Sequence, residues 1–424
     1  MAFKTPRGTN DILPEDQAYW SYIWGTAEQV AASFGFSRID TPMFEDTSLF
    51  RHGVGEATDI VEKEMYSFDD LGGDNITLKP EGTAPVCRAY IQHGMANLPQ
   101  PVRLFYENPH FRYERPQAGR VRQHHQFGVE IIGDPSPQVD AEIIELGWTY
   151  LSSLGLKDLT LKINSIGDGE CRPAYMEMLG SYLAEHESRI CDDHQKRYKT
   201  NPLRVLDCKK PTCHSVSAEA PSSVDNLCDA CNEHFDGLRA TLDDLVEAGA
   251  MVQYTVDNRL VRGLDYYNRT VFEFEPAEEK GQSTLLGGGR YDPLIEILGG
   301  KSTPGIGFGS GVERVMLNLK AQGIEVPEAR PLDVICVHIG DNARRKLVTL
   351  AATLRATGKS VIVAPEGRSM KSQMRYANNS GARYALILGD RDLEQGEATL
   401  RPLLGDAPET QVVLDAAVIA TGLA

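Results

Sequence analysis

Two apolar runs, Val102–Tyr106 and Phe127–Ile132, flank a polar stretch that a β-ladder cannot cross. Apolar runs of this length predict strands. Pro116 and Gly119 lie between them among polar neighbours, and such residues end a ladder or form a turn. The sequence therefore predicts an antiparallel hairpin with the polar stretch at its tip.

The rest of the first 325 residues carries strand signals around one polar insertion. Asp140–Leu154 has helical periodicity with an Asp near its start. Residues from about 170 to 255 are more polar and hold most of the cysteines. Glycine-rich Gly305–Gly311 runs into a predicted helix. Further predicted strands are Phe36–Ile39, Ile76–Leu78, Arg259–Phe274 and Gly287–Tyr291. This order favours an α+β domain with a largely antiparallel sheet.

A different pattern follows the predicted linker at Lys320–Arg330. Strand-like and helix-length segments alternate there as DVICVHIG, ARRKLVTLAATLRATG, SVIVAP, KSQMRYANNSG and RYALILGD. Alternation of this kind predicts a small α/β domain with mainly parallel strands, over residues 331–424. From Pro331 onward the chain holds 11 Lys/Arg and 10 Asp/Glu, whereas the whole chain has a formal net charge of −17.

A chain of 424 residues is long enough for two or three domains. No apolar run approaches the roughly 18 residues that cross a bilayer, and MAFKTPRGTNDILPED has no apolar signal segment. We therefore expect a cytoplasmic protein without membrane contact. Its eight cysteines are then expected to be reduced thiols or metal ligands.

The hairpin tip concentrates positive charge in an acidic chain. Arg112, Arg115, Arg120 and Arg122 lie within eleven residues, and there is no Lys between Pro80 and Lys157. Arginine favours planar, bidentate recognition of phosphate or carboxylate. A solvated hairpin tip would show the same charge, so the residues alone leave both interpretations open.

Three further motifs are compatible with an anionic ligand. In LVRGLDYYN, Arg262 precedes two tyrosines, which predicts either a pocket wall or an edge strand with a paired Arg and Asp. In GIGFGSGVER, Arg314 lies near a positive helix end. In KPEGTAP, Thr83 is the predicted helix N-cap, and Glu81 is either exposed or receives an ammonium group.

Together these motifs resemble histidyl-tRNA synthetases, a family of class II aminoacyl-tRNA synthetases. The resemblance covers almost the whole chain and is carried, in family order, by PRGTNDILPED, LKPEGTAP, FRYERPQAGRVRQHHQFGVE, LVRGLDYYN, GGGRYD and GIGFGSGVERV. VRGLDYY is the most specific of them. The C-terminal VIVAPEGRSMKSQMRYANNSGARYALILGD resembles the family's anticodon-binding domain.

The resemblance implies a class II catalytic domain at 1–325, with its insertion, and an α/β anticodon-binding domain at 331–424. It implies that ATP, with Mg²⁺, activates L-histidine as an adenylate, which is then transferred to tRNA-His by a homodimer. The implied catalytic residues are Arg262 and Arg112. The implied histidine-binding residues are Glu81, Gly82, Thr83, Arg112, Gln126, Glu130, Arg262, Tyr266 and Tyr267. The implied ATP-binding residues are Arg112, Glu114, Arg120 and Arg314.

The alternative is a non-catalytic paralogue of the same fold, the regulatory subunit of ATP phosphoribosyltransferase. Such subunits typically lose the Arg of VRGLDYY and lack the anticodon domain. Here Arg262, Arg112 and Arg314 are present, and we expect the C-terminal domain to be complete. Residues Asn342–Gly389 hold nine Lys/Arg and one acid, Glu366, which suits an RNA backbone or a solvated helix face.

The insertion contains short Cys/His pairs at spacings that tetrahedral zinc sites use. They are Cys191-x2-His194, Cys208-x4-Cys213-His214 and Cys228-x2-Cys231. We consider two interpretations, a structural zinc site drawn from Cys191, Cys208, Cys213, Cys228 and Cys231, or free thiols. The pairs offer more candidates than the four ligands that one such site needs.

Overall fold

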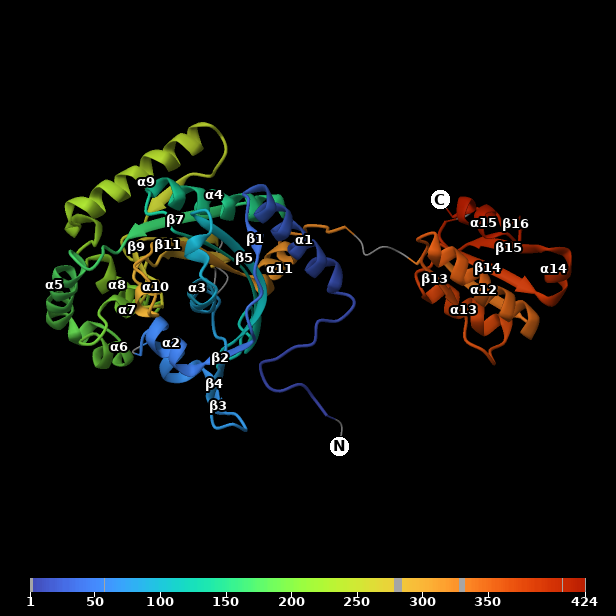
Figure 1. Ribbon diagram of the computed structural model, residues 1–424, viewed down its shortest axis with the longest axis horizontal. Coiled ribbons are helices and arrows are strands. Elements are labelled where there is room, and N and C mark those ends of the chain that lie inside the picture. The colour runs from blue at the N-terminus through green and yellow to red at the C-terminus, as the bar shows by residue number, and fades with distance from the viewer. Residues whose placement is uncertain (1–2, 57, 278–283, 328–331, 406, 424) are drawn as a thin grey trace. The chain divides into compact units, whose positions relative to one another are not determined.

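A computed structural model describes residues 3–56, 58–277, 284–327, 332–405 and 407–423. The chain forms two compact units, Met1–Val326 and Pro327–Ala424 (Figure 1). Within the described residues, no helix is both long and apolar enough to cross a membrane.

The first unit is built on an eight-stranded sheet in the order β1-β5-β6-β11-β10-β9-β7-β8. Every pair from β5 to β7 is antiparallel, and only the two outer pairs, β1–β5 and β7–β8, are parallel. The predicted antiparallel sheet is therefore confirmed. The strands are β1 (Ser37–Arg38), β5 (Val102–Phe111), β6 (Gln123–Ile132), β7 (Leu159–Ser165), β8 (Tyr254–Val256), β9 (Asn268–Pro276), β10 (Leu286–Arg290) and β11 (Gly305–Gly311).

The predicted hairpin is β5 and β6, and its strands are longer than the apolar runs suggested. The ladder continues to the pair Phe111↔Gln123, so Arg112 directly follows β5 and the loop spans 112–122. Backbone hydrogen bonds form the ladder, and they do not require apolar side chains on both faces. Polar residues at this end of the hairpin, such as His124, His125 and Gln126, are therefore part of strand β6 and not of the loop.

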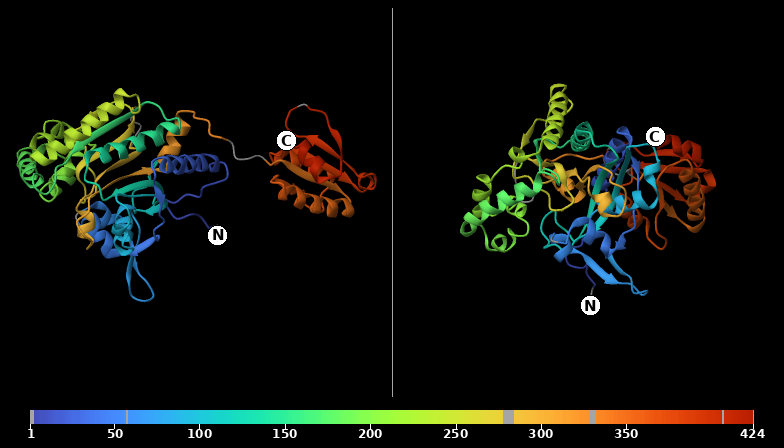
Figure 2. Two further views of the ribbon diagram at one scale, coloured as in Figure 1. Left: turned by 45° about the horizontal axis from the view of Figure 1, so that its top comes forward. Right: turned by 60° about the vertical axis from the view of Figure 1, so that its left-hand side comes forward.

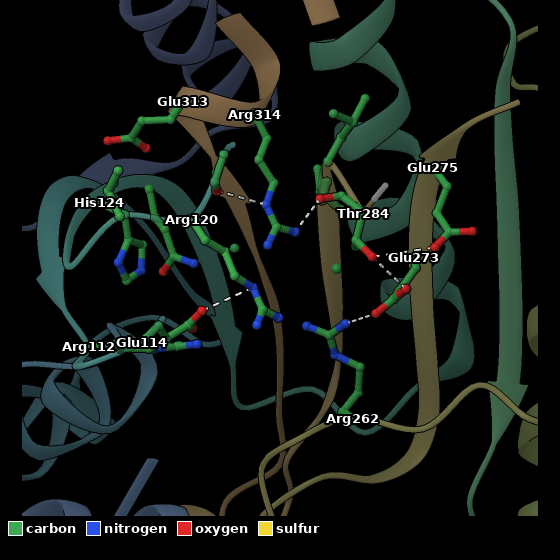
Figure 3. A pocket seen from close by; sticks show the side chains of 18 of the residues that line it. Arg112, Glu114, Arg120, His124, Arg262, Glu273, Glu275, Thr284, Glu313 and Arg314 are labelled. Carbon is green, nitrogen blue, oxygen red and sulfur yellow. Dashed lines mark hydrogen bonds and ion pairs between the residues drawn. The ribbon is translucent and has the colours of Figure 1, made fainter. Parts of the chain in front are cut away.

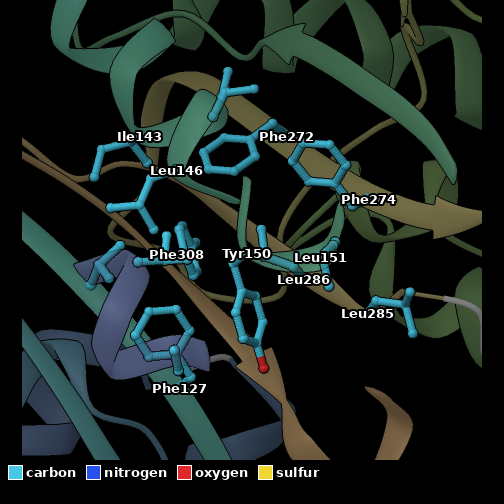
Figure 4. Packing of buried hydrophobic residues seen from close by; sticks show 14 of the residues in the cluster. Phe127, Ile143, Leu146, Tyr150, Leu151, Phe272, Phe274, Leu285, Leu286 and Phe308 are labelled. Carbon is cyan, nitrogen blue, oxygen red and sulfur yellow. The ribbon is translucent and has the colours of Figure 1, made fainter. Parts of the chain in front are cut away.

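Side chains alternate between the two faces of the sheet, as strand geometry requires. On β6, Phe127, Val129 and Ile131 join the core under the helices, whereas Gln126 and Glu130 point to the opposite face. Figure 4 shows Phe127 with Phe272, Phe274 and Phe308 from neighbouring strands, packed against residues of one helix. The helices of this core are α1 (Gln17–Ser33), α4 (Pro137–Ser153), α9 (Asp229–Glu247) and α11 (Val312–Ala321).

The glycine-rich segment predicted to precede a helix is itself the strand β11, between β6 and β10. Its Ile306 and Phe308 join the core, while its glycines lie on the other face. A Cβ on Gly307 would lie 1.9 Å from Glu130 Oε2. The glycines therefore leave the sheet bare where side chains from neighbouring segments cross it.

The opposite face carries smaller elements and the part of the insertion before α9. A three-stranded sheet in the order β2-β4-β3 lies there with five helical elements. These elements are β2 (Phe44–Asp46), α2 (Thr47–Val54), η1 (Ile60–Glu64), β3 (Tyr66–Asp69), β4 (Asn75–Leu78), α3 (Thr83–Gln92), η2 (Met95–Asn97) and α10 (Leu294–Ile297).

The polar insertion between β7 and β8 is helical. Figures 1 and 2 show α5–α8 gathered as a cluster beside the sheet, with α9 lying across its top. Its elements before α9 are α5 (Arg172–Glu185), η3 (Glu187–Arg189), α6 (Asp192–Arg197), α7 (Leu203–Leu206), α8 (Pro211–Ala218) and η4 (Val224–Asn226).

The strand predicted at Arg259–Phe274 is wrong in its first half. The ladder begins only at Asn268, and Leu260–Tyr267 is a loop. Asp257 forms a turn that diverts the chain, because its carbonyl accepts from the Leu260 N–H and its carboxylate accepts from the Arg259 N–H. Arg262 thus stands on a loop over the sheet.

The second unit has a five-stranded sheet in the order β13-β12-β14-β15-β16. Its three predicted strands are parallel, as expected, and an antiparallel β15–β16 hairpin, which the sequence analysis missed, extends the sheet. The predicted α/β class is therefore confirmed. The elements are β12 (Val334–Ile339), α12 (Asp341–Ala356), β13 (Val361–Val363), α13 (Met370–Asn379), β14 (Tyr384–Gly389), α14 (Asp390–Gln395), β15 (Glu397–Pro402), β16 (Thr410–Val413) and α15 (Ala416–Gly422).

Candidate active site

A cavity of about 280 Å³ opens over the glycines of β10 and β11, on the face opposite the helical core. Four arginines line it: Arg112, Arg120, Arg262 and Arg314. Figure 3 shows the guanidinium groups of Arg120, Arg262 and Arg314 directed towards one another across the cavity. Carboxylates line it as well, those of Glu114, Asp207, Glu273, Glu275 and Glu313. Guanidinium groups beside carboxylates suit a phosphate ligand that is bound together with a cation.

The Arg262 side chain is held by a carboxylate on β9, and a glycine on β10 leaves space for it. Its guanidinium forms an ion pair with Glu273, which also accepts from the Thr284 hydroxyl over 3.0 Å. A Cβ on Gly287 would lie 2.5 Å from Arg262 Nη1, so this glycine provides the space for the side chain. Glu273 was missed by sequence reasoning, although the alternation FEFEP already placed it on the polar face of a strand.

Backbone carbonyls hold two of the other arginines. Arg112 Nε donates to the Pro80 carbonyl over 2.8 Å. Arg314 donates from Nη1 to the Thr284 carbonyl over 2.9 Å and from Nε to the Gly119 carbonyl over 3.3 Å. Burial, reinforced by nearby Arg120, lowers the pKa of Arg314. A negative ligand in the cavity would relieve that repulsion.

The remaining hairpin arginines separate into different surroundings. Arg120 forms an ion pair with Glu114 over 3.0 Å inside the cavity. The Arg122 guanidinium stacks on the Tyr113 ring at 3.7 Å, and its backbone N–H donates to the Gly8 carbonyl. Arg122 therefore packs against the N-terminal segment, and Arg115 is exposed.

The predicted histidine-binding residues at the start of α3 form a compact buried group. The Glu81 carboxylate accepts from the backbone N–H groups of Thr83 and Ala84, over 2.8 and 2.9 Å, and from the Tyr266 hydroxyl over 3.2 Å. Thr83 was predicted to be the N-cap, and that prediction is wrong. The helix begins at Thr83, and the Glu81 side chain caps it from outside.

Glu130 is fully buried and accepts from three hydroxyl groups. Thr83 and Tyr106 contact its Oε1 over 2.8 and 3.3 Å, and Tyr291 contacts its Oε2 over 2.7 Å. Burial raises the pKa of Glu130 to about 8 against the opposing effect of these donors. Tyr106 and Tyr291 were not predicted, although Tyr291 belongs to the GGGRYD motif.

The two groups of residues are joined through β6. Gln126 lines the arginine cavity, and Glu130 follows four positions later on the same face of the strand. Tyr267 is also buried, and its ring centroid lies 4.7 Å from that of Tyr266 and 5.9 Å from the Arg262 guanidinium carbon. A buried group of carboxyl and hydroxyl side chains thus adjoins the cavity that the arginines line.

The five candidate cysteines do not meet at one point. Cys191, Cys208 and Cys213 gather with His194, whereas Cys228 and Cys231 gather with Asp168 and Cys171, two residues that sequence reasoning did not include. His214 lies outside both groups and contacts the Arg259 guanidinium.

Comparison with known proteins agrees with this arrangement. A family model described as histidyl-tRNA synthetase matches residues 8–167 and 213–315, and one described as anticodon binding domain matches residues 332–418. The histidine–tRNA ligase of Dehalococcoides mccartyi is 49% identical over 97% of both chains, and that of Caldanaerobacter subterraneus is 47% identical over 98% of both.

A solved structure gives the same result. The apo histidyl-tRNA synthetase of S. aureus superposes with a TM-score of 0.81 at 38% identity, covering 99% of both chains. The similarity extends over both units, and the architecture is the class II synthetase fold with a C-terminal anticodon-binding domain. The chain therefore belongs to the histidyl-tRNA synthetase family.

Proposed function

We propose that this chain ligates L-histidine to tRNA-His, through a histidyl-adenylate formed from ATP. The observation that carries the proposal is the strand β6, which brings the buried Glu130 pocket and the arginine cavity together on one face. Adenylate formation requires this adjacency, because the histidine carboxylate must reach the α-phosphate of ATP. The names of the similar proteins support the same activity.

The pocket around Glu81 and Glu130 selects histidine. The Glu81 carboxylate receives the ammonium group of histidine. Gly82 allows the backbone to lie close to the Tyr106 ring, because a Cβ there would lie 2.3 Å from that ring. Glu130 accepts from one imidazole nitrogen, with Tyr266, Tyr267 and Gln126 lining the remaining space. An imidazole offers one donor and one acceptor, so buried polar partners reject side chains that lack them.

The arginine cavity holds ATP, taken up as its Mg²⁺ complex. Arg112 and Arg262 contact the α-phosphate from opposite sides, and Arg120, Arg314 and Glu114 surround the rest of the nucleotide. Arg262 stabilises the charge that develops when the histidine carboxylate attacks. Glu273 holds its guanidinium in place.

The second unit binds the anticodon stem of tRNA-His. Between Asn342 and Gly389 it carries nine Lys/Arg and the single acid Glu366, which suits the phosphates of an RNA backbone. The first unit extends over residues 1–325 and the second over 331–424. We further propose that the protein is a cytoplasmic homodimer, as the family resemblance implies.

Histidine-stimulated exchange of pyrophosphate into ATP, followed by charging of tRNA-His, tests the proposal. We expect exchange with histidine and none with phenylalanine or glutamine. A regulatory subunit of the same fold would bind histidine without exchange, and that outcome would overturn the proposal. Arg112, Arg262 and Arg314 all line the cavity here, which favours the synthetase.

A further inference from the structure

The helical insertion contains two clusters of metal-ligating side chains that take no part in the proposed chemistry. Cluster A is Cys191, His194, Cys208 and Cys213, and cluster B is Asp168, Cys171, Cys228 and Cys231. In each cluster the four ligand atoms lie within 4.8 Å of one another. Four donors at that spacing can be shared by one ion, because zinc–sulfur bonds of about 2.3 Å in a tetrahedron separate two sulfurs by about 3.8 Å.

Cluster A joins two segments of the insertion. Cys191 and His194 lie at the start of α6, and Cys208 and Cys213 lie around the start of α8. His194 turns its Nδ1 inward, 3.2 Å from the Cys191 sulfur and 3.8 Å from the Cys213 sulfur. The Cys191 backbone N–H donates to the Cys213 sulfur over 3.2 Å. Three cysteines and one histidine are a donor set of structural zinc sites.

Cluster B ties the beginning of the insertion to the start of α9. Asp168 and Cys171 follow β7, and Cys228 and Cys231 lie at the N-terminus of α9. Asp168 Oδ1 faces the sulfurs of Cys171 and Cys228, at 3.9 and 4.0 Å, and accepts from the Glu170 N–H. Its other oxygen, Oδ2, accepts from Arg269 Nη2 over 3.1 Å.

That division of the Asp168 carboxylate is typical of a metal ligand. One oxygen is directed at the sulfurs while an outer arginine orients the other, and such outer contacts fix a ligand for its metal. Arg269 also offsets part of the negative charge that three thiolates and a carboxylate leave around a divalent cation. Gly167 allows the cluster to close, because a Cβ there would lie 2.6 Å from the Cys171 sulfur.

Disulfides explain these clusters less well than metal ions. Each cluster has three thiols, so one cysteine would remain unpaired beside any disulfide. A disulfide would also give no reason for His194 or Asp168 to face the sulfurs. All eight cysteines are free thiols in the structure. Deprotonated thiols, a neutral imidazole and a carboxylate are the ligands that zinc takes in proteins.

We propose that the insertion holds two structural zinc ions, one in each cluster. The sites fix the insertion against the active site at two places. Cys208 lies between Asp207 and Lys209, which both line the arginine cavity. Near cluster B, Arg172 at the start of α5 donates to the Tyr267 carbonyl over 2.7 Å. Between α5 and α9 the helices of the insertion have at most eight residues, and the bound ions hold these short segments together.

Zinc content of the full chain tests the proposal directly. Elemental analysis after purification under reducing conditions, without chelator, should give two zinc ions per chain. Cys191→Ser should lose the ion of cluster A and Cys228→Ser that of cluster B, leaving one each. Cys336→Ser, a buried cysteine of the second unit, is the matched control and should keep two.

X-ray absorption at the zinc edge of the unmodified protein provides a readout that does not depend on whether a variant folds. We expect an average of about three sulfurs near 2.3 Å and one nitrogen or oxygen near 2.0–2.1 Å. Fewer than one zinc per chain, iron in its place, or disulfides within the clusters would overturn the proposal. One zinc that survives Cys228→Ser but not Cys191→Ser would overturn cluster B.

Discussion

The Tyr291 hydroxyl donates to Glu130 over 2.7 Å, the shortest of the three hydroxyl contacts that this carboxylate accepts. Tyr291→Phe removes this donor and leaves the ring in place. We expect the KM for histidine in pyrophosphate exchange to rise about twofold to tenfold, because a hydrogen bond to a neutral group contributes about 0.5–1.5 kcal/mol. Tyr22→Phe is the control, since that hydroxyl donates to the remote Ser153 carbonyl. An unchanged KM in Tyr291→Phe would contradict the role given to Glu130.

Arg262→Ala should lower kcat for adenylate formation by at least about 10²-fold, the usual effect of removing a group that stabilises transition-state charge. The matched control is Arg259→Ala in the same loop, where the side chain contacts Asp257 and His214 instead. Single-turnover formation of the adenylate measures the step. Near-normal rates in Arg262→Ala would refute the assignment.

Loss of Arg262 also leaves Glu273, whose side chain is only 15% exposed, without its ion pair. The double variant Arg262→Ala/Glu273→Gln should therefore recover thermal stability relative to Arg262→Ala, because a largely desolvated charge without a partner is costly. Activity should stay low in both. Thermal melting and exchange assays on the same samples separate a folding defect from a catalytic one, and recovery of activity would show that Arg262 acts only structurally.

Glu130 predicts a pH dependence of stability. Its pKa is raised by burial from 4.5 to about 8, so between these values the native protein binds a proton that the unfolded chain releases. The free energy of unfolding should consequently fall as the pH rises from about 5 to 8. Glu130→Gln cannot titrate at this position. Its free energy of unfolding should therefore fall by about 2–4 kcal/mol less than that of the unmodified protein over this pH range.

Urea unfolding at pH 5.5 and 8 measures the difference between the two proteins. Tryptophan fluorescence reports the first unit alone, because the three tryptophans are Trp20, Trp24 and Trp148. Equal pH dependence in Glu130→Gln and the unmodified chain would show that Glu130 is ionised throughout this range.

A buried ion network predicts the largest effect on stability. Arg290 is fully buried and forms ion pairs with Asp140 over 2.5 Å and Asp292 over 2.9 Å. Arg290→Met should lower the free energy of unfolding by about 3–5 kcal/mol, because it leaves the fully buried Asp140 carboxylate without its guanidinium partner. Arg103→Met, which breaks the partly exposed pair with Glu142, should cost under about 1 kcal/mol. Similar losses of free energy of unfolding in the two variants would show that the Arg290 network stabilises the fold no more than a partly exposed ion pair does.

The pattern of apolar residues correctly predicted those strands that can be recognised from a short stretch of sequence. The runs at Val102–Tyr106 and Phe127–Ile132 gave the central hairpin, and alternation after the linker gave the parallel strands of the second unit. The segment Leu260–Tyr267 was wrongly predicted as a strand because it contains several apolar and aromatic residues. Its apolar residues pack in a cluster shared with the insertion, a tertiary contact that no period reveals.

The candidate site shows the same division. Motif residues such as Glu81, Arg112 and Arg262 could be singled out from the sequence because each stands in a distinctive local motif. Tyr106 and Asp168 were not, because their roles depend on neighbours far along the chain. Tyr106 meets Glu130 only when β5 pairs with β6, and Asp168 meets Cys228 across sixty residues.

Because β6 divides its side chains between core and pocket, tolerance to substitution along it should oscillate. A complete mutational scan of this strand would return two interleaved profiles. Positions 127, 129 and 131 would report protein abundance, whereas positions 126 and 130 would lose aminoacylation beyond any loss of abundance. Gly128 belongs with the first group, because a Cβ there would lie 2.2 Å from the Tyr106 ring. Apart from Gly128, a period of two residues in the ratio of aminoacylation to abundance would recover the pleat of the strand from the scan.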